Sequence, residues 1–176
     1  IMSNKNKIPV YLLIAILFYK LVKKPSVAIK DIVDELPKHP TKTFSVRPLQ
    51  QIDRLILHHF ASNGTPEAVA NYHINNRDWP GIAYHYVIAK DGTIYKTNRH
   101  ETISYHVAGE NYRSIGISLE GNFEIEPHIP AQINSLNFLI PYLRSQFPQP
   151  LEVYQHSDFS IIKPYDANLD LTPYKL

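Results

Sequence analysis

Apolar residues cluster in short runs that have the length of β-strands. Residues 54–60 (RLILHHF) form a near-continuous apolar run, which is typical of a strand covered on both faces. Residues 83–90 and 93–97 are separated by Asp91 and Gly92, and this pair predicts a β-hairpin with a tight turn. The pattern therefore predicts a sheet that contains an antiparallel pair of strands.

Two further strands are predicted later in the chain. Residues 114–120 (SIGISLE) contain Gly116, which indicates close backbone approach or tight packing at that point. Residues 151–155 predict a short last strand, after which the sequence is irregular and rich in Asp, Pro and Tyr.

Two segments have the periodicity and the boundary residues of helices. Thr65 and Pro66 are a suitable cap and first-turn residue for a helix that extends to about residue 76. Residues 130–147 start with proline and carry apolar residues at helical spacing, and Pro141 is expected to kink this helix. Interleaved strands and helices predict an α/β fold, a single domain with a central mixed β-sheet flanked by helices.

The N-terminal region differs in character from the rest of the chain. Residues 8–19 (IPVYLLIAILFY) are apolar on every side and have lysines at both ends. The pattern predicts an apolar helix that acts as a membrane anchor or signal-like segment over residues 1–24, with anchoring through residues 8–22. An amphipathic or buried helix is the alternative. We therefore expect a protein of the cell envelope, membrane-anchored or exported.

The segment that follows predicts a linker. Residues 25–51 contain Pro, Lys and Thr with weak periodicity, which is typical of a tether between a membrane segment and a domain. The folded domain is then expected to occupy residues 52–176.

Composition excludes several classes of function. The 176-residue chain has 44% hydrophobic and 19% charged residues, as expected for one folded domain with an attached segment. Its formal net charge is only +2 and its Lys and Arg residues are scattered, which argues against a nucleic-acid partner. The chain has no cysteine, so any transition-metal site must use His and carboxylate ligands.

Three residues at or after predicted strand ends are candidate metal ligands. His58 lies near the end of the first strand, His156 ends the last strand, and Asp166 follows ten residues later. Two imidazoles and one carboxylate are the number and kind of ligands that a catalytic zinc ion uses, with a fourth position open for water. Spacing alone leaves an alternative open, in which the histidines are ordinary core or surface residues.

Most of the other histidines have structural interpretations. Neighbouring residues of a strand point to opposite faces, so His59 is expected to face away from His58, and His85 away from Tyr84. Four others lie in polar stretches and are expected at the surface. These four are His39, His73, His100 and His128.

Four sequence blocks occur in a characteristic order. They are LILHHFAS (55–62), WPGIAYHYVIAKDGTIYKT (79–97), YHVAGENYRSIGISLEGNF (105–123), and QHSD with KPYD (155–166). In this arrangement the chain resembles the zinc-dependent N-acetylmuramoyl-L-alanine amidase family, which includes phage lysozyme-type amidases and peptidoglycan recognition proteins. The resemblance implies an amidase domain over residues 52–176.

The resemblance also implies a function for individual residues. His58, His156 and Asp166 match the family's zinc ligands, and Tyr84 matches the tyrosine that active members place beside the metal. The implied reaction is hydrolysis of the amide bond between N-acetylmuramic acid and L-alanine in peptidoglycan or muropeptides. Zinc would activate the attacking water and polarise the carbonyl group.

Two further residues match positions that line the groove for sugar and peptide, and these are His106 and Asn111. Peptidoglycan or muropeptide is therefore the expected partner, and we expect a monomer.

The family also has members that bind muropeptides without cutting them, so a non-catalytic recognition domain is one alternative. A metal-dependent amidohydrolase with another substrate and a membrane-anchored structural protein are the others.

The sequence departs from the family pattern near the third ligand and in one strand. The family's lysine two residues before that ligand is replaced by Pro164, which makes the adjacent Lys163 the candidate catalytic lysine. Ser118 occupies a position where some members have a catalytic glutamate. Ala167 follows the third ligand, where many relatives have proline.

Overall fold

The structure is a computed structural model that describes residues 27–160 and 167–176. Within these residues, six strands form one mixed sheet. The order across the sheet is β1-β4-β3-β5-β2-β6. β3 and β4 pair antiparallel and all other neighbours pair parallel, which confirms the predicted mixed sheet. The strands are β1 (Ile29–Asp31), β2 (Arg54–His59), β3 (Tyr86–Ile88), β4 (Ile94–Lys96), β5 (Ser114–Leu119) and β6 (Glu152–Gln155).

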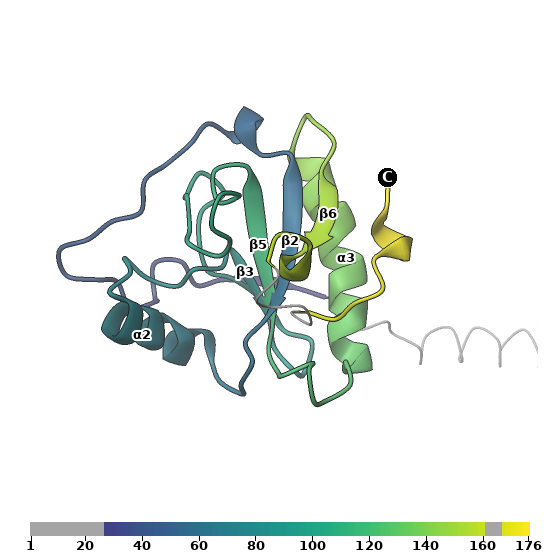
Figure 1. Cartoon of the computed structure of the whole chain (residues 1–176), viewed down its shortest axis with the longest axis horizontal. Coiled ribbons are helices and arrows are strands. Elements are labelled where there is room, and N and C mark those ends of the chain that lie inside the picture. Colours follow the sequence, from purple (N-terminus) through teal and green to yellow (C-terminus); the bar gives the residue numbers. More distant parts are fainter. Residues whose placement is uncertain (1–26, 161–166) are drawn as a thin grey trace, which may run out of the picture.

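Two α-helices lie on opposite faces of this sheet among the described residues, as Figure 1 shows. α2 (Pro66–Arg77) begins at Thr65, whose hydroxyl accepts a hydrogen bond from Ala68 N at 3.2 Å. α3 (Pro130–Gln146) also starts with proline, and Pro141 lies inside it. Both predicted helices are therefore confirmed. Three short 3-10 turns complete the elements: η1 (Leu49–Gln51), η2 (His156–Asp158) and η3 (Thr172–Tyr174).

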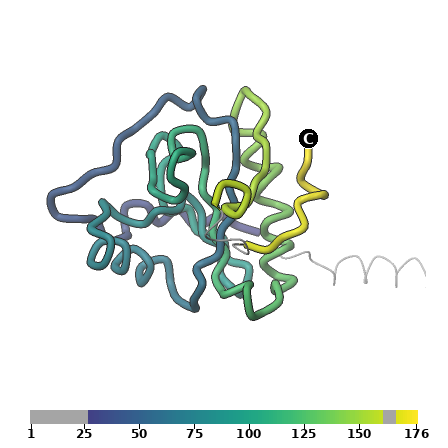
Figure 2. The backbone as a smooth tube through the Cα atoms, viewed as in Figure 1, coloured from purple at the N-terminus to yellow at the C-terminus, as the bar shows by residue number. Residues whose placement is uncertain are grey.

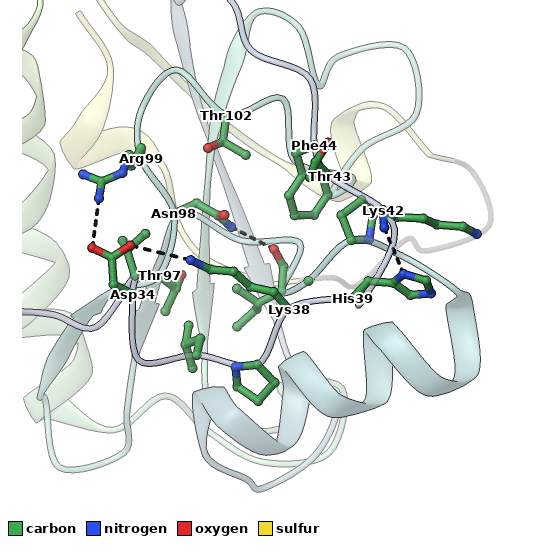
Figure 3. Close-up of a pocket in the computed structure, with 16 residues that line it drawn as sticks. Asp34, Lys38, His39, Lys42, Thr43, Phe44, Thr97, Asn98, Arg99 and Thr102 are labelled. Atoms are coloured by element: carbon green, nitrogen blue, oxygen red, sulfur yellow. Dashed lines mark hydrogen bonds and ion pairs between the residues drawn. The ribbon is translucent and has the colours of Figure 1, made fainter.

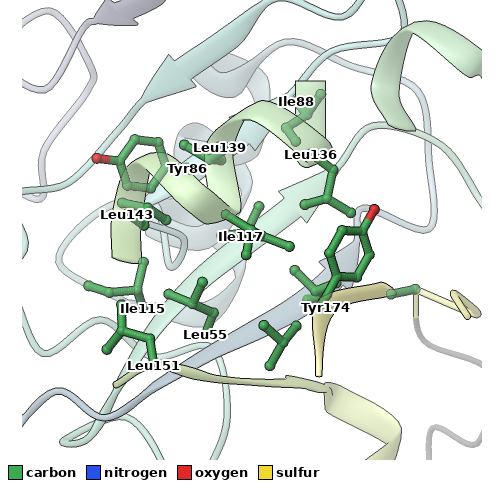
Figure 4. Packing of buried hydrophobic residues seen from close by; sticks show 14 of the residues in the cluster. Leu55, Tyr86, Ile88, Ile115, Ile117, Leu136, Leu139, Leu143, Leu151 and Tyr174 are labelled. Carbon is green, nitrogen blue, oxygen red and sulfur yellow. The ribbon is translucent and has the colours of Figure 1, made fainter. Parts of the chain in front are cut away.

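The main core fills the space between α3 and the sheet (Figure 4). Ile115, Ile117 and Leu119 of β5 point to this side and are fully buried, as are Leu136 and Leu139 of α3. Full burial of each such side chain stabilises the fold by roughly 1.5–3 kcal/mol relative to exposure. Because strand residues alternate in direction, the polar or small residues of β5 face the other side, towards α2.

The hairpin forms where the sequence predicts it. Ala89 N donates to Thr93 O and Gly92 N donates to Ala89 O, both at 2.9 Å. Gly92 has a φ of +87°, in the left-handed region that glycine adopts without steric cost.

The segment expected to be a tether belongs to the folded domain over residues 27–51. Ile29–Asp31 pairs with β4 as the edge strand β1, and Leu36 joins the core cluster on the α2 side. Figure 2 follows the segment as the purple and blue tube that passes around the domain before β2. The sequence pattern missed it because β1 has three residues, of which two are exposed, so no alternation is visible.

The expected N-terminal apolar helix, with the anchor over residues 8–22, lies outside the described residues. Within residues 27–160 and 167–176, no helix has both the length and the apolar content that a membrane crossing requires.

Candidate active site

The register of the sheet brings His58 and His156 together. β2 and β6 are parallel, and Leu57 is aligned with Gln155. The residues that follow them, His58 and His156, therefore lie at the same edge of the sheet. Asp158 accepts a hydrogen bond from Gln155 N at 2.9 Å and so shapes the 3-10 turn that carries His156. The rings of His58 and His156 have centroids 4.9 Å apart. Strand order, register and this turn together bring the two imidazoles side by side.

Tyr84 lies beside this pair. Its ring centroid is 5.3 Å from that of His58, and its backbone oxygen accepts hydrogen bonds from Thr97 Oγ1 at 2.8 Å and Asn98 Nδ2 at 2.6 Å. These two contacts fix the backbone that carries the tyrosine. The structure therefore brings together three of the residues that the sequence selects for the site.

His106 reaches the same place from the loop before β5. Its Nδ1 lies 3.0 Å from His58 Nε2, and its ring packs directly over the backbone of Gly116. A Cβ at position 116 would lie 2.7 Å from His106 Cγ, so only glycine leaves room for the ring. The close approach that the glycine predicts in this strand is therefore made by His106.

The hydrogen bonds of His106 indicate where its protons lie. Ser114 donates its single hydroxyl proton to Glu110 O at 2.7 Å, so it accepts at 3.1 Å from His106 Nε2. Burial lowers the pKa of His106 well below its ordinary value, which favours the neutral ring. Its Nδ1 is then an acceptor for His58 Nε2–H, and this assigns the proton of His58 to Nε2.

Asn111 and Arg47 hold the loop that carries His106. The Asn111 side-chain oxygen accepts from Val107 N at 2.8 Å, and the backbone oxygen of Asn111 accepts from the Arg47 guanidinium. Arg47 also donates to Ser114 O at 2.7 Å and is 3% exposed. Burial lowers the pKa of Arg47 to about 10, so it stays charged at neutral pH. A residue of the expected linker thus fixes one wall of the site.

A groove of about 890 Å³ runs past these residues. His106, Asn111, Tyr84 and His156 line it, and α2 supplies much of another wall. Its remaining described lining includes Phe60, Ala61, Ser62, Asn63, Gly64, Tyr72, His73, Arg77, Trp79 and Tyr105.

Two of the predicted site residues, Asp166 and Lys163, lie outside the described residues. Across residues 27–160 and 167–176, no three His, Asp or Glu side chains converge in a way that could hold a metal ion. The donor chemistry of the described pair nevertheless fits zinc, because His58 and His156 place two imidazoles side by side at the groove. A zinc site would need a third ligand, and Asp166 remains the predicted one.

His73 is a groove residue that the sequence analysis missed. It was expected at the surface, but it is 7% exposed, and its Nδ1 accepts a hydrogen bond from Ala83 N at 3.1 Å. Its ring centroid lies 5.8 Å from that of Tyr84. The signal was present, because Ala70 is one helical turn earlier on the same buried face of α2. The other three histidines expected at the surface are half-buried: His39, His100 and His128.

The expected orientation of His59, away from His58, is confirmed. His59 faces the α3 side, where its Nδ1 accepts from Phe123 N at 3.0 Å. His85 is fully buried and accepts from Gly116 N at 3.0 Å, and burial lowers its pKa well below its ordinary value. Ser118, the residue in the place of the family's glutamate, is fully buried.

A second cavity of about 340 Å³ lies between the 33–44 segment and the loops around residues 80–82 and 97–102 (Figure 3). Arg99 donates to Asp34 at 2.9 Å there, and Lys38 lies 3.6 Å from the other oxygen of the same carboxylate. The cations of this cavity are therefore already paired within the protein.

Comparison with known sequences assigns the chain to a family. A profile of the N-acetylmuramoyl-L-alanine amidase family matches residues 48–168. The chain belongs to this family. The resemblance seen in the four sequence blocks is thereby confirmed.

Relatives in the amidase family include both enzymes and recognition proteins. Peptidoglycan-recognition protein SC1a of Drosophila melanogaster is 30% identical over 116 residues, which are 60% of this chain and 63% of the relative. The endolysin of Enterobacteria phage K11 is 28% identical over 83 residues, which are 44% of this chain and 55% of the endolysin. The chain thus spans less than two thirds of the length of each of these relatives.

Solved structures agree with this assignment. The N-acetylmuramoyl-L-alanine amidase LysC from Clostridium intestinale URNW is 30% identical, with a TM-score of 0.64 over 78% of this chain and 88% of LysC. Drosophila PGRP-LB shares the fold at 18% identity, with a TM-score of 0.71 over 86% of this chain and 97% of PGRP-LB.

Proposed function

We propose that this protein is a zinc-dependent amidase that hydrolyses the bond between N-acetylmuramic acid and L-alanine in peptidoglycan or muropeptides. The observation that carries the proposal is the convergence of His58, His156 and Tyr84 beside one groove, in a chain of the amidase family. A family member that binds muropeptides without cleaving them needs only the groove. An enzyme also needs a reactive centre, and the cluster of His58, His156 and Tyr84 provides one.

The residues that would hold the zinc ion are His58, His156 and Asp166. A bound zinc ion supplies an activated water at neutral pH and polarises the scissile carbonyl group. Because the proton of His58 is assigned to Nε2, its Nδ1 is the nitrogen with a lone pair for a metal. His106 has a positioning role here, since it fixes both the ring orientation and the proton of His58.

Tyr84 and Lys163 are the proposed catalytic residues. The Tyr84 hydroxyl would donate a hydrogen bond to the oxyanion that develops on the carbonyl oxygen, or orient the attacking water. Lys163 would place positive charge near the same oxyanion. The substrate would be held by groove residues, with His106 and Asn111 among them. PGRP-LE, a protein of the same fold at 22% identity, has been solved in complex with tracheal cytotoxin, a monomeric diaminopimelic acid-type peptidoglycan.

The test is to incubate the purified protein with muropeptides and identify the products by mass spectrometry, with and without a chelator. The proposal predicts a free peptide with an L-alanine amino terminus, a sugar with a free lactyl carboxylate, and no products when chelator is present. Binding without cleavage would establish a recognition domain instead, and cleavage that the chelator does not affect would exclude the zinc mechanism.

A further inference from the structure

Ser114 is a fully buried serine whose two hydrogen-bond partners fix the direction of its single hydroxyl proton. Its Oγ lies 2.7 Å from Glu110 O and 3.1 Å from His106 Nε2. A carbonyl oxygen can only accept, so the hydroxyl donates to Glu110 and offers a lone pair to His106. Because Ser114 is the first residue of β5, this acceptor is held in place by the sheet.

This acceptor selects one of the two neutral forms of the His106 ring. Only the form with its proton on Nε2 can donate to Ser114. Among the described residues, no carboxylate forms an ion pair with His106, whose ring contacts are to other histidines. A charge on this ring, which is 6% exposed, would therefore have no compensating partner. The neutral ring then has a lone pair on Nδ1.

The ring form of His106 determines that of His58. His58 Nε2 lies 3.0 Å from His106 Nδ1, so Nε2 has to carry the proton of the His58 ring. The result is one directed series of hydrogen bonds, in which His58 donates to His106 and His106 donates to Ser114. Each neutral ring has a single proton, so reversing the form of His106 forces the same change in His58.

We propose that Ser114 is a positioning residue of the site, whose hydroxyl sets the ring form of His106 and thereby presents Nδ1 of His58, rather than Nε2, to the metal. This inference rests on the proposed function for the identity of the bound ion. The position of the ring protons is a property of the protein itself, and it can be measured without metal or substrate.

Ser114→Ala removes the acceptor and leaves the neighbouring backbone satisfied. Glu110 O still accepts a hydrogen bond from Arg113 N at 3.0 Å. His106 Nε2–H, by contrast, would become a buried donor without an acceptor, which is unfavourable. The reversed series, in which His106 Nδ1 donates to His58 Nε2, is then expected to become populated. In that series the proton of His58 lies on Nδ1, the nitrogen that the metal would need.

Two measurements on the full-length protein test this inference. Long-range proton–nitrogen NMR spectra of the metal-free protein, at mildly alkaline pH where histidine rings are neutral, show which ring nitrogen carries the proton. Zinc affinity is then measured by competition with a chelator. The variants are Ser114→Ala, His106→Ala and the double variant. Ser104→Ala is the matched control, because Ser104 is also fully buried and its Oγ lies 3.2 Å from Nδ1 of His85, which also accepts from Gly116 N.

The proposal predicts that His58 and His106 both carry the proton on Nε2 in the wild type. Ser114→Ala should populate the Nδ1 form of both rings and weaken zinc binding about tenfold to 100-fold. In the His106→Ala background, adding Ser114→Ala should change zinc affinity by less than about twofold, because the serine acts only through that ring. Ser104→Ala should match the wild type in both measurements.

Unchanged ring forms in folded Ser114→Ala would overturn the proposal, as would a loss of zinc affinity that persists in full in the His106→Ala background. If Ser114→Ala does not fold, the wild-type spectra decide: protons on Nε2 of both rings support the proposal, and a proton on Nδ1 of either ring overturns it. A wild-type protein that binds no zinc would refute the zinc-dependent amidase and the metal-binding part of this inference. The spectra would still decide whether Ser114 sets the two ring forms.

Discussion

Replacing His58 with alanine is expected to reduce peptide release by about 1000-fold or more, which corresponds to about 4 kcal/mol of activation free energy. The change removes one of the two adjacent imidazoles, those of His58 and His156. It also removes the group that donates a hydrogen bond to His106. Initial rates of muropeptide cleavage measure the effect. His39→Ala is the matched control, because His39 is paired with Asp78 at 3.2 Å and lines the second cavity instead of the groove.

His58 is buried, so loss of activity in this variant has to be separated from loss of folding. His156→Ala provides the separation, because His156 is half-buried and its removal disturbs the core less. Both variants should retain cooperative thermal unfolding while losing activity. Cleavage by folded His58→Ala at more than a tenth of the wild-type rate would contradict the role of this residue.

Gly116→Ala is expected to lower the cleavage rate about 100-fold, although the change adds a single methyl group. The new Cβ would lie 2.7 Å from His106 Cγ and 2.8 Å from its Nδ1, so the ring has to move away from His58. A displacement of about 1 Å in a supporting group is enough for a loss of this size. In Gly81→Ala, the control, the new Cβ would make an ordinary contact of 3.6 Å with Phe44.

Overpacking at position 116 is also expected to destabilise the fold, by about 1–3 kcal/mol. Chemical denaturation of Gly116→Ala and of the double variant with His106→Ala measures this cost. Removing the ring should restore most of the stability but none of the lost activity. Wild-type activity in the single variant would show that the position of His106 does not matter for the reaction.

The sequence predicted those parts of the fold that leave a periodic or local signal. The apolar run of β2, the Asp91-Gly92 turn and the capped start of α2 each depend on residues close together in the chain. β1 was missed because it is an edge strand of three residues whose stability comes from pairing with β4, far away in the sequence.

Part of the candidate site could also be predicted from the sequence. Residues that end parallel strands meet at one edge of a sheet, so the meeting of His58 and His156 followed from the strand pattern together with the family resemblance. The contact between His106 and His58 depends on how a loop returns over Gly116, and nothing in the local sequence encodes that path. The burial of Arg47 escaped prediction for the same reason, since its acceptors are backbone oxygens of residues far away in the sequence.

The central claim is that His58, His156 and Asp166 hold one zinc ion on which cleavage depends. Its most direct test is to strip the protein with a chelator, remove the chelator, and measure bound zinc and peptide release together as zinc is added back. The account predicts that activity returns in proportion to bound zinc and is complete at one ion per chain, with no such return in His58→Ala. Full activity of the metal-free protein, or zinc binding that is unchanged in His58→Ala, would contradict it.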